Sequence, residues 1–174
     1  MSSTNRRSGV RSKKDHYETP RYTLMSLINH HKLNYPILEP CAGHGSIANI
    51  LKLNGEVITN DIDLDMECDY NFDYLCWNPG NKFNTILTNP PFNLAEQIIK
   101  KSIQDLNIGG EAIMLLRLDF LGTEKRRQFW KNHPTKHIYA LSKRPRFIRS
   151  GDSNEYGWYV WKKGWTGKTT LEVI

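Results

Sequence analysis

Short apolar runs alternate with amphipathic segments along the chain. The runs predict buried strands, and apolar residues at helical spacing between them predict helices that begin after Pro20, after Ser46, at Asn93 and after Thr123. Strands that alternate with helices are typical of an α/β protein with a largely parallel sheet. The predicted strands are one beginning at Ile37 and those over residues 56–59, 85–88, 111–118, 136–141 and 156–161.

Local residue types indicate where the predicted helices begin. Thr19 is a predicted N-cap of the first helix, with Pro20 in its first turn, and Ser46 is a predicted cap of the second. Asn93 opens a capping-box-like start for the third. From Lys162 the chain is polar, which predicts a frayed end.

The tetrapeptide Asn89-Pro90-Pro91-Phe92 directly follows one of these strands. Ligands in an open α/β sheet bind at the carboxyl ends of the strands. The prolines fix the backbone and remove two N–H donors, so that carbonyl groups there can point outward as acceptors. An asparagine oxygen beside such a carbonyl suits an amino group with two N–H bonds, and Phe92 offers a face for a flat ring. A proline-rich turn without function is the alternative.

Two further strands are followed by residues suited to a nucleotide-like ligand. Gly43 and Gly45 permit a tight turn before a helix, the arrangement that binds nucleotides in Rossmann-like units, although the third glycine of the dinucleotide fingerprint is missing. Asp61 ends the next strand, 18 residues after Gly43, where such folds place an acceptor for ribose hydroxyls. A solvated acidic turn is the alternative for Asp61.

A second acidic position is Asp73, which lies within an apolar and aromatic stretch, Phe72–Trp77. An unpaired carboxylate among apolar side chains would be costly. Its partner is either a purine amino group or a backbone cap.

The net charge of the chain indicates what kind of partner it could bind. The 174 residues carry a net charge of +6, which favours a polyanion, and we expect DNA, with RNA as an alternative. Residues 1–14 hold five cations and no acid, which predicts a flexible tail before a single domain over 15–174. The segment Lys143–Arg149 interleaves Lys143, Arg144 and Arg146 with Phe147, a pattern suited to phosphate contact and base stacking, or simply to a solvated turn.

Other classes of protein are not favoured. No apolar run has the length of a membrane span, and the N-terminus lacks the apolar core of a secretory signal. Three cysteines without close spacing suggest buried thiols in a reducing compartment, so we expect a cytoplasmic protein without a metal site. His30 and His31 are adjacent and would point to different sides of a helix.

The order of these motifs resembles the gamma-type DNA adenine-N6 methyltransferases, and above all the TaqI-type catalytic domain. The resemblance covers roughly residues 15–95 and rests on Tyr-x-Thr-Pro, Leu-Glu-Pro-Cys-Ala-Gly-His-Gly, Asn-Asp-Ile-Asp, Phe-Asp-Tyr-Leu and Asn-Pro-Pro-Phe. It implies an S-adenosylmethionine-dependent enzyme with a Rossmann-like class I fold. The expected sheet is doubly wound, mostly parallel and seven-stranded, with an antiparallel last strand.

The resemblance also implies roles for single residues. Asn89 and Pro90 would hold the target amino group within the catalytic tetrapeptide, and Phe92, with Phe147, would stack on the target base. Asp61 would bind the ribose hydroxyls. The implied cofactor site comprises Tyr17, Thr19, Pro20, Glu39, Cys41, Ala42, Gly43, Gly45, Asp61, Ile62, Asp73, Tyr74 and Asn89. The implied substrate contacts are Phe92, Lys143, Arg144, Arg146 and Phe147.

One feature departs from the family. Larger members carry a separate target-recognition domain, but here the residues after 95 are needed to complete the sheet. Small phage-borne and mobile-element enzymes often look like this, so we expect such an origin, a monomer or weak dimer, and a possible separate specificity partner. The alternatives are an amino methyltransferase for RNA or a protein glutamine, and a non-catalytic module that binds cofactor or nucleic acid.

Overall fold

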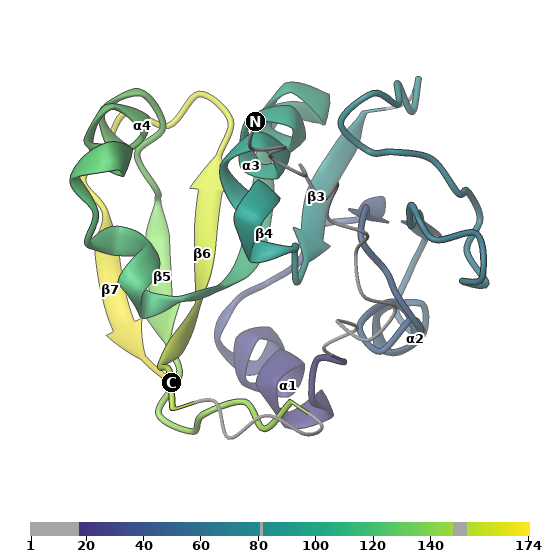
Figure 1. Cartoon of the computed structure of the whole chain (residues 1–174), viewed down its shortest axis with the longest axis horizontal. Coiled ribbons are helices and arrows are strands. Elements are labelled where there is room, and N and C mark those ends of the chain that lie inside the picture. Colours follow the sequence, from purple (N-terminus) through teal and green to yellow (C-terminus); the bar gives the residue numbers. More distant parts are fainter. Residues whose placement is uncertain (1–17, 81, 148–152) are drawn as a thin grey trace, which may run out of the picture.

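In a computed structural model of the chain, residues 18–80, 82–147 and 153–174 are described. They form one seven-stranded sheet with the strand order β2-β1-β3-β4-β6-β5-β7, most of which can be followed in Figure 1. The strands are β1 Ile37–Glu39, β2 Val57–Thr59, β3 Phe83–Thr88, β4 Leu106–Arg117, β5 His137–Ala140, β6 Tyr156–Lys162 and β7 Thr170–Val173. The α-helices are α1 Arg21–His30, α2 Ala48–Leu51, α3 Ala95–Asp105 and α4 Arg127–Asn132.

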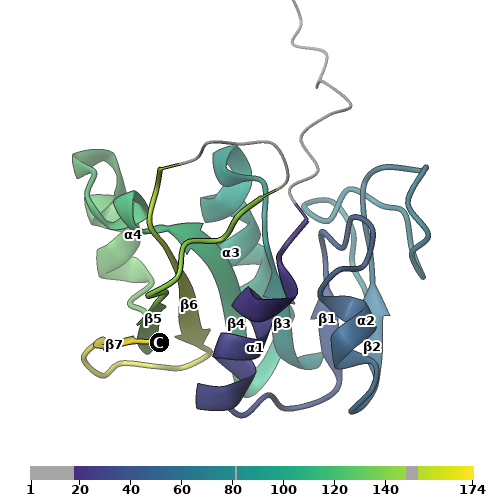
Figure 2. The same cartoon turned by 90° about the horizontal axis from the view of Figure 1, so that it is seen from below.

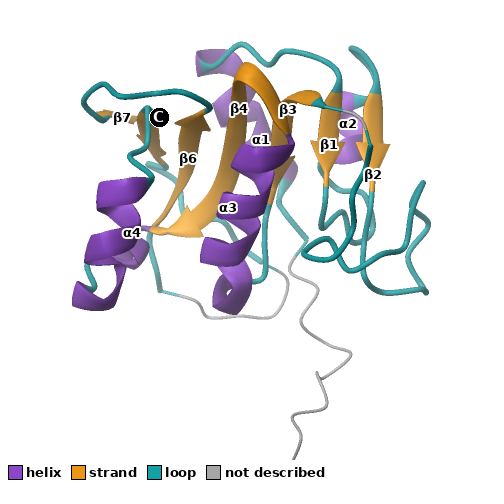
Figure 3. Ribbon diagram, turned by 90° about the horizontal axis from the view of Figure 1, so that it is seen from above, coloured by secondary structure: helices purple, strands orange, loops and turns teal. Residues whose placement is uncertain are grey.

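Six strands point the same way, and β6 runs antiparallel to its two neighbours, β4 and β5. The predicted doubly wound, mostly parallel sheet is therefore confirmed. The antiparallel strand is the predicted strand over 156–161, and β7 follows it at the edge of the sheet. The carboxyl ends of β1, β2 and β3 consequently meet at one edge, where the loops that follow β1 and β2 gather in Figure 3.

Helices cover both faces of the sheet. Side chains of α1 and α2 pack with Ile113 and Leu115 of β4, whereas α3 and α4 pack with Ala112 and Met114. Alternate residues of β4 thus face opposite layers, as the two-residue period of a strand requires. Because both faces are covered, the central strands are buried and read as continuous apolar runs. Figure 2 shows α1 and the α3–α4 pair on opposite sides of the sheet.

The predicted caps are wrong. The N-termini of α1, α2 and α3 have no side-chain cap hydrogen bond. Thr19 and Ser46 instead contact residues distant in sequence, and the chain from Phe92 to Leu94 forms a 3₁₀ turn, η1, before α3 begins at Ala95. The hydroxyl groups of Thr19 and Ser46 therefore make tertiary contacts and do not cap helices.

Two other boundaries differ from the prediction. β4 begins at Leu106, five residues before the predicted start at 111, and the polar end predicted to fray contains β7. All four residues of β7 are exposed, so burial of one face does not hold the strand in place. It forms because its backbone pairs in parallel with β5, from His137 opposite Thr170 to Ala140 opposite Val173.

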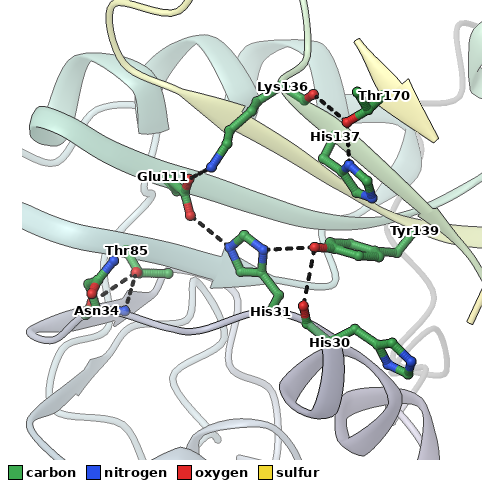
Figure 4. A network of polar contacts seen from close by, with 9 residues as sticks. All are labelled: His30, His31, Asn34, Thr85, Glu111, Lys136, His137, Tyr139 and Thr170. Atoms are coloured by element: carbon green, nitrogen blue, oxygen red, sulfur yellow. Dashed lines mark hydrogen bonds and ion pairs between the residues drawn. The ribbon is translucent and has the colours of Figure 1, made fainter. Parts of the chain in front are cut away.

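A network of buried polar side chains lies at the edge of the sheet opposite the carboxyl ends of β1–β3 (Figure 4). Glu111, only 6% exposed, accepts hydrogen bonds from His31 Nε2 at 2.7 Å and Lys136 Nζ at 2.8 Å. The other ring nitrogen of His31 lies 3.1 Å from the Tyr139 hydroxyl. Burial alone would raise the pKa of Glu111, but the hydrogen bonds and charges of His31 and Lys136 lower it below its ordinary value.

We expect Glu111→Gln to lower the free energy of unfolding near neutral pH by about 1–3 kcal/mol, since it removes a buried charged acceptor. The folded-state pKa of Glu111 is lowered, so its stabilisation is present above the ordinary carboxyl pKa of 4.5 and disappears as the pH falls through the folded value. Urea unfolding of both proteins across that range should show curves that converge in acid. Glu172→Gln, which changes an exposed carboxylate of β7, is the matched control and should have little effect.

Candidate active site

A cavity of about 690 Å³ opens at the carboxyl ends of β1, β2 and β3. Thirteen residues of the site predicted from sequence line it: Thr19, Glu39, Cys41, Ala42, Gly43, Asp61, Ile62, Asp73, Tyr74, Asn89, Pro90, Pro91 and Phe92. These residues come from five separate segments of the chain, which the parallel strand order brings to one edge. The topology thus assembles most of the predicted site.

The loop after β1 is tied to the end of β2. Gly43 and Gly45 have φ angles of 52° and 77°, a left-handed region that side chains with a Cβ rarely adopt. The Gly43 N–H donates to Asp61 Oδ2 at 2.8 Å, and the Asp63 N–H donates to Asp61 Oδ1 at 3.0 Å. The Asp61 carboxylate, 8% exposed, is therefore held in one orientation at the cavity wall.

Glu39, at the end of β1, is the most deeply buried acid of the cavity wall, with 1% exposure. Burial raises its pKa well above the ordinary value, and the nearby Asp61 charge adds to this, whereas a hydrogen bond from the Ala48 backbone and the charge of Lys52 oppose it. Within the described part of the chain, Glu39 Oε2 has no hydrogen-bond partner. Such a buried acceptor favours a ligand that brings a donor or a positive charge.

The loop after β2 contributes a further acidic residue and two aromatic residues to the cavity lining. Asp73 is exposed, and its Oδ1 accepts a hydrogen bond from the Leu75 N–H at 3.0 Å, so the backbone-cap alternative is observed. Tyr74 is buried, its hydroxyl lies 3.3 Å from Ser102 Oγ, and burial, with the nearby Asp105 charge, raises its pKa. Phe72, half exposed, also lines the cavity and is the more accessible ring.

The tetrapeptide after β3 lines the same cavity. Asn89 Nδ2 donates to Thr19 Oγ1 at 3.2 Å, and Pro90 is buried. The Pro91 carbonyl accepts from the Leu94 N–H at 2.9 Å, which starts the 3₁₀ turn η1. Phe92 packs against the apolar clusters of both faces, with its ring 6.0 Å from that of Tyr156.

Phe147 does not occupy the position predicted for it. Its side chain is 3% exposed and its ring packs edge-on against Tyr156 at 5.1 Å, within the core on the α1 face. A ring enclosed in the core offers no face to an incoming base, so this geometry contradicts the stacking role. The sequence pattern misled because an aromatic residue among cations can equally anchor a surface loop to the core.

The remaining predicted residues lie outside the cavity lining, namely Pro20, Gly45, Lys143, Arg144 and Arg146, whereas Tyr17 falls outside the described residues. The basic segment is anchored to α1. Tyr22 donates its hydroxyl to the Arg144 carbonyl at 2.8 Å and accepts from the Arg146 N–H at 2.8 Å, and Lys143 Nζ lies 4.3 Å from its ring centre. The exposed Arg144 and Glu155 side chains form an ion pair.

Sequence reasoning missed several lining residues. Ser46, Ile47, Phe72, Leu75 and Ile98 line the cavity, but each was read only as a cap or a core position, or was given no role. Their proximity to Gly45, Asp73 and Phe92 was a signal for some of them. Ile98 lies on α3, and only the packing of that helix brings its side chain to the cavity.

Three further features concern membrane-spanning helices, metal ligands and cysteines. No helix of the described segments is long and apolar enough to cross a membrane. Among the residues described, no group of three or more His, Cys, Asp or Glu side chains could hold a metal ion. The three cysteines are unbridged, and none is buried: Cys41 and Cys68 are partly exposed and Cys76 is exposed, contrary to the expectation of buried thiols.

The comparisons with known proteins place this fold. No family model and no curated protein sequence matches the chain. A structure assigned as a class I S-adenosylmethionine-dependent methyltransferase from Listeria monocytogenes superposes with a TM-score of 0.62 at 16% identity, over 87% of this chain and 62% of that one. The modification subunit assigned to a type I restriction enzyme of Vibrio vulnificus YJ016 gives 0.65 at 12% identity, over 94% and 48%.

A third neighbour, assigned as an RNA methyltransferase of Pyrococcus horikoshii, has a TM-score of 0.57 at 14% identity, over 82% of this chain and 81% of that one. The chain therefore spans less than two thirds of the first two of these neighbours. At these identities the likeness establishes the fold, which is the Rossmann-like fold of class I methyltransferases.

Proposed function

We propose that the protein transfers a methyl group from S-adenosylmethionine to the exocyclic N6 amine of adenine in DNA. The observation that carries the proposal is the position of Asn89-Pro90-Pro91-Phe92 at the carboxyl end of β3, on the wall of a cavity that also contains Asp61 and the Gly43 turn. The resemblance of these motifs to the adenine-N6 enzymes and the class I fold support the same conclusion.

The residues of the cavity fit the cofactor. The glycine turn lets a ligand approach the backbone, Asp61 presents a fixed carboxylate for ribose hydroxyls, and Glu39 supplies a buried acceptor suited to a positively charged group. Asp73 and the neighbouring aromatic residues would receive the adenine ring of the cofactor. When bound, S-adenosylmethionine supplies an activated methyl group.

The tetrapeptide would hold the target amine. An aromatic exocyclic amine is a poor nucleophile because its lone pair is delocalised into the ring. Acceptors at the Asn89 side chain and the Pro90 carbonyl would bind its two hydrogens and favour a pyramidal nitrogen. Fixed acceptors of this kind lower a barrier by positioning and by preorganised electrostatics. The base must leave the helical stack, and Phe92 would stack on it.

Cations at the same edge of the sheet support a nucleic-acid substrate. The segment between β4 and the start of α4 carries Lys125 and Arg127, and the loop after β5 carries Lys143, Arg144 and Arg146, all exposed. Because β4 and β5 are parallel to β3, these loops lie at the edge that contains the cavity. Phosphates of a duplex presented to the cavity would meet them.

We expect Arg144→Ala combined with Arg146→Ala to flatten the salt dependence of DNA binding, because each lost phosphate contact reduces the slope of log affinity against log salt by about one. Fluorescence anisotropy with a labelled duplex over a series of salt concentrations measures the slope. The control is Lys32→Ala with Lys168→Ala, which removes the same charge from loops at the opposite edge. Equal slopes for the two double variants would contradict a DNA-binding role for the 143–146 segment.

The function is tested with tritiated cofactor and separate pools of DNA, RNA and protein. Label in adenine of DNA is the expected result. Label confined to RNA or to protein glutamine would establish the alternative amino methyltransferase, and cofactor binding without transfer to any pool would indicate a non-catalytic module. RNA is included in the test because one structural neighbour is assigned as an RNA methyltransferase.

We further propose weak sequence selectivity or a short recognition site, since the described residues after α3 complete the sheet and its α4 cover. Mapping modified adenines in random-sequence DNA tests this. Modification restricted to one motif of about six base pairs or more would instead require a reader outside this domain, such as a specificity partner. One structural neighbour is assigned as the modification subunit of a type I restriction enzyme. In that case a separate specificity subunit is the first partner to seek.

A further inference from the structure

The strand β7 forms one edge of the sheet, and none of the described strands pairs with its outer side (Figure 3). All four of its residues are exposed, including Leu171 at 61% and Val173 at 64%. Since neighbouring residues of a strand point to opposite faces, neither face of β7 is buried. An edge strand that exposes apolar side chains and outward backbone groups is a template for pairing with another strand.

The backbone groups on the outer side of β7 follow from its bonds to the neighbouring strand. The N–H groups of Thr170 and Ile174 donate to carbonyl groups in and next to β5, at 3.2 and 2.9 Å. Alternate residues of a strand bond to the same side, so Leu171 and Val173 direct their N–H and C=O groups outward. The two exposed apolar residues of β7 are thus also the ones that can bond to a further strand.

The charges near β7 favour one way of pairing two copies of it. In an antiparallel pair related by a two-fold axis, outward-bonding residues lie opposite one another. A register centred on Glu172 would place two carboxylates face to face, which is destabilising, and one centred on Leu171 would place Glu172 opposite Thr170. A register centred on Thr170 places Glu172 of each copy opposite Lys168 of the other, and both side chains are exposed.

We propose that two copies of this chain associate through β7, in an antiparallel pair centred on Thr170 that joins their sheets. Leu171 of one copy would lie at the diagonal position to Leu171 of the other, on the same face of the joined sheet. Exposed ion pairs contribute little each, so the dimer is a weak one. Three strands separate β7 from β3, so the pairing leaves the cavity open and does not depend on the proposed methyl transfer.

Reversal of the two charges tests the pairing by analytical ultracentrifugation. The wild type should show a monomer–dimer equilibrium, and Glu172→Lys or Lys168→Glu alone should raise the dimer Kd about tenfold, because like charges then face each other twice. The double variant, with both charges exchanged, should return the Kd to within about twofold of the wild type. Glu67→Lys makes the same charge change in the exposed loop after β2 and should leave the Kd unchanged.

A disulfide at the proposed two-fold axis gives a second readout. Thr170→Cys would face its own mate at a non-hydrogen-bonded position, where Cβ atoms lie about 4.5–5.5 Å apart, so small adjustments permit an interchain disulfide. Val173→Cys is the matched control, because its mate would lie beyond reach on the far side of the axis. Mild oxidation followed by non-reducing electrophoresis should yield a dimer for Thr170→Cys, and much less for Val173→Cys and for the wild type.

Three results would overturn the proposal. A wild type that stays monomeric at every concentration, together with no cross-link in Thr170→Cys, would show that the charges of β7 only protect an edge that stays unpaired. A dimer whose Kd is the same in both single charge variants would assign the contact to another surface. Equal cross-linking of Thr170→Cys and Val173→Cys would exclude the register centred on Thr170.

Discussion

Asn89→Ala is expected to reduce methyl transfer about 10²–10³-fold, the usual cost of removing one fixed electrostatic partner from an active site. The side chain extends from the carboxyl end of β3 to the cavity wall, and its amide nitrogen is already bound to Thr19. The variant loses one of the two acceptors for the target amine, so the loss should fall on kcat. Single-turnover assays with labelled cofactor measure the chemical step directly.

Cofactor binding by Asn89→Ala should remain close to that of the wild type, since Asp61, Glu39 and the glycine turn are untouched. Asn54→Ala, which changes an exposed asparagine outside the cavity, is the matched control and should retain full activity. Turnover by Asn89→Ala within about twofold of the wild-type rate would show that the amine is not held by this residue.

Asp61→Ala is expected to weaken the binding of S-adenosylmethionine about tenfold or more, because a hydrogen bond to a charged acceptor contributes roughly 1.5–3 kcal/mol. The same carboxylate holds the backbone N–H groups of Gly43 and Asp63. The substitution therefore removes an acceptor for the ribose and also releases the loop after β1. Isothermal titration calorimetry of both proteins gives the two affinities.

Asp65→Ala provides the comparison for Asp61→Ala, because Asp65 is an exposed carboxylate of the same loop and lies outside the main cavity. It should bind the cofactor as the wild type does. Equal affinity in Asp61→Ala and in the wild type would remove the assignment of Asp61 to the ribose. Thermal unfolding of each variant shows whether release of the loop also lowers the stability of the domain.

Most of the residues that line the cavity were predictable because they directly follow elements with strong local sequence signals. Buried parallel strands read as apolar runs, and the residue that follows each run lies at the ligand-binding edge. Asn89 and Gly43 follow such runs closely, and Asp61 follows β2 by two residues. Glycines in the left-handed region at 43 and 45 follow from the same local rule.

Other features depended on contacts between distant segments. Thr19 and Ser46 have the residue types of helix caps, and only the packing of the opening segment against the loops after β1 and β3 turns them toward each other and toward Asn89. The aromatic Phe147 could face a ligand or the core, and the position of Tyr156 on β6 places it in the core. Local sequence contains no information that separates these outcomes.

The sequence by itself therefore determined the α/β class, the positions of most strands along the chain and the residues that follow β3, because these depend on short-range patterns and on rules of connection. The tertiary structure alone decided the edge strand β7, the buried Glu111 network and the contact between Asn89 and Thr19. Each of these arises from hydrogen bonds between segments separated by about 25 residues or more, and the geometry of such bonds is fixed only when the sheet and its helices pack together.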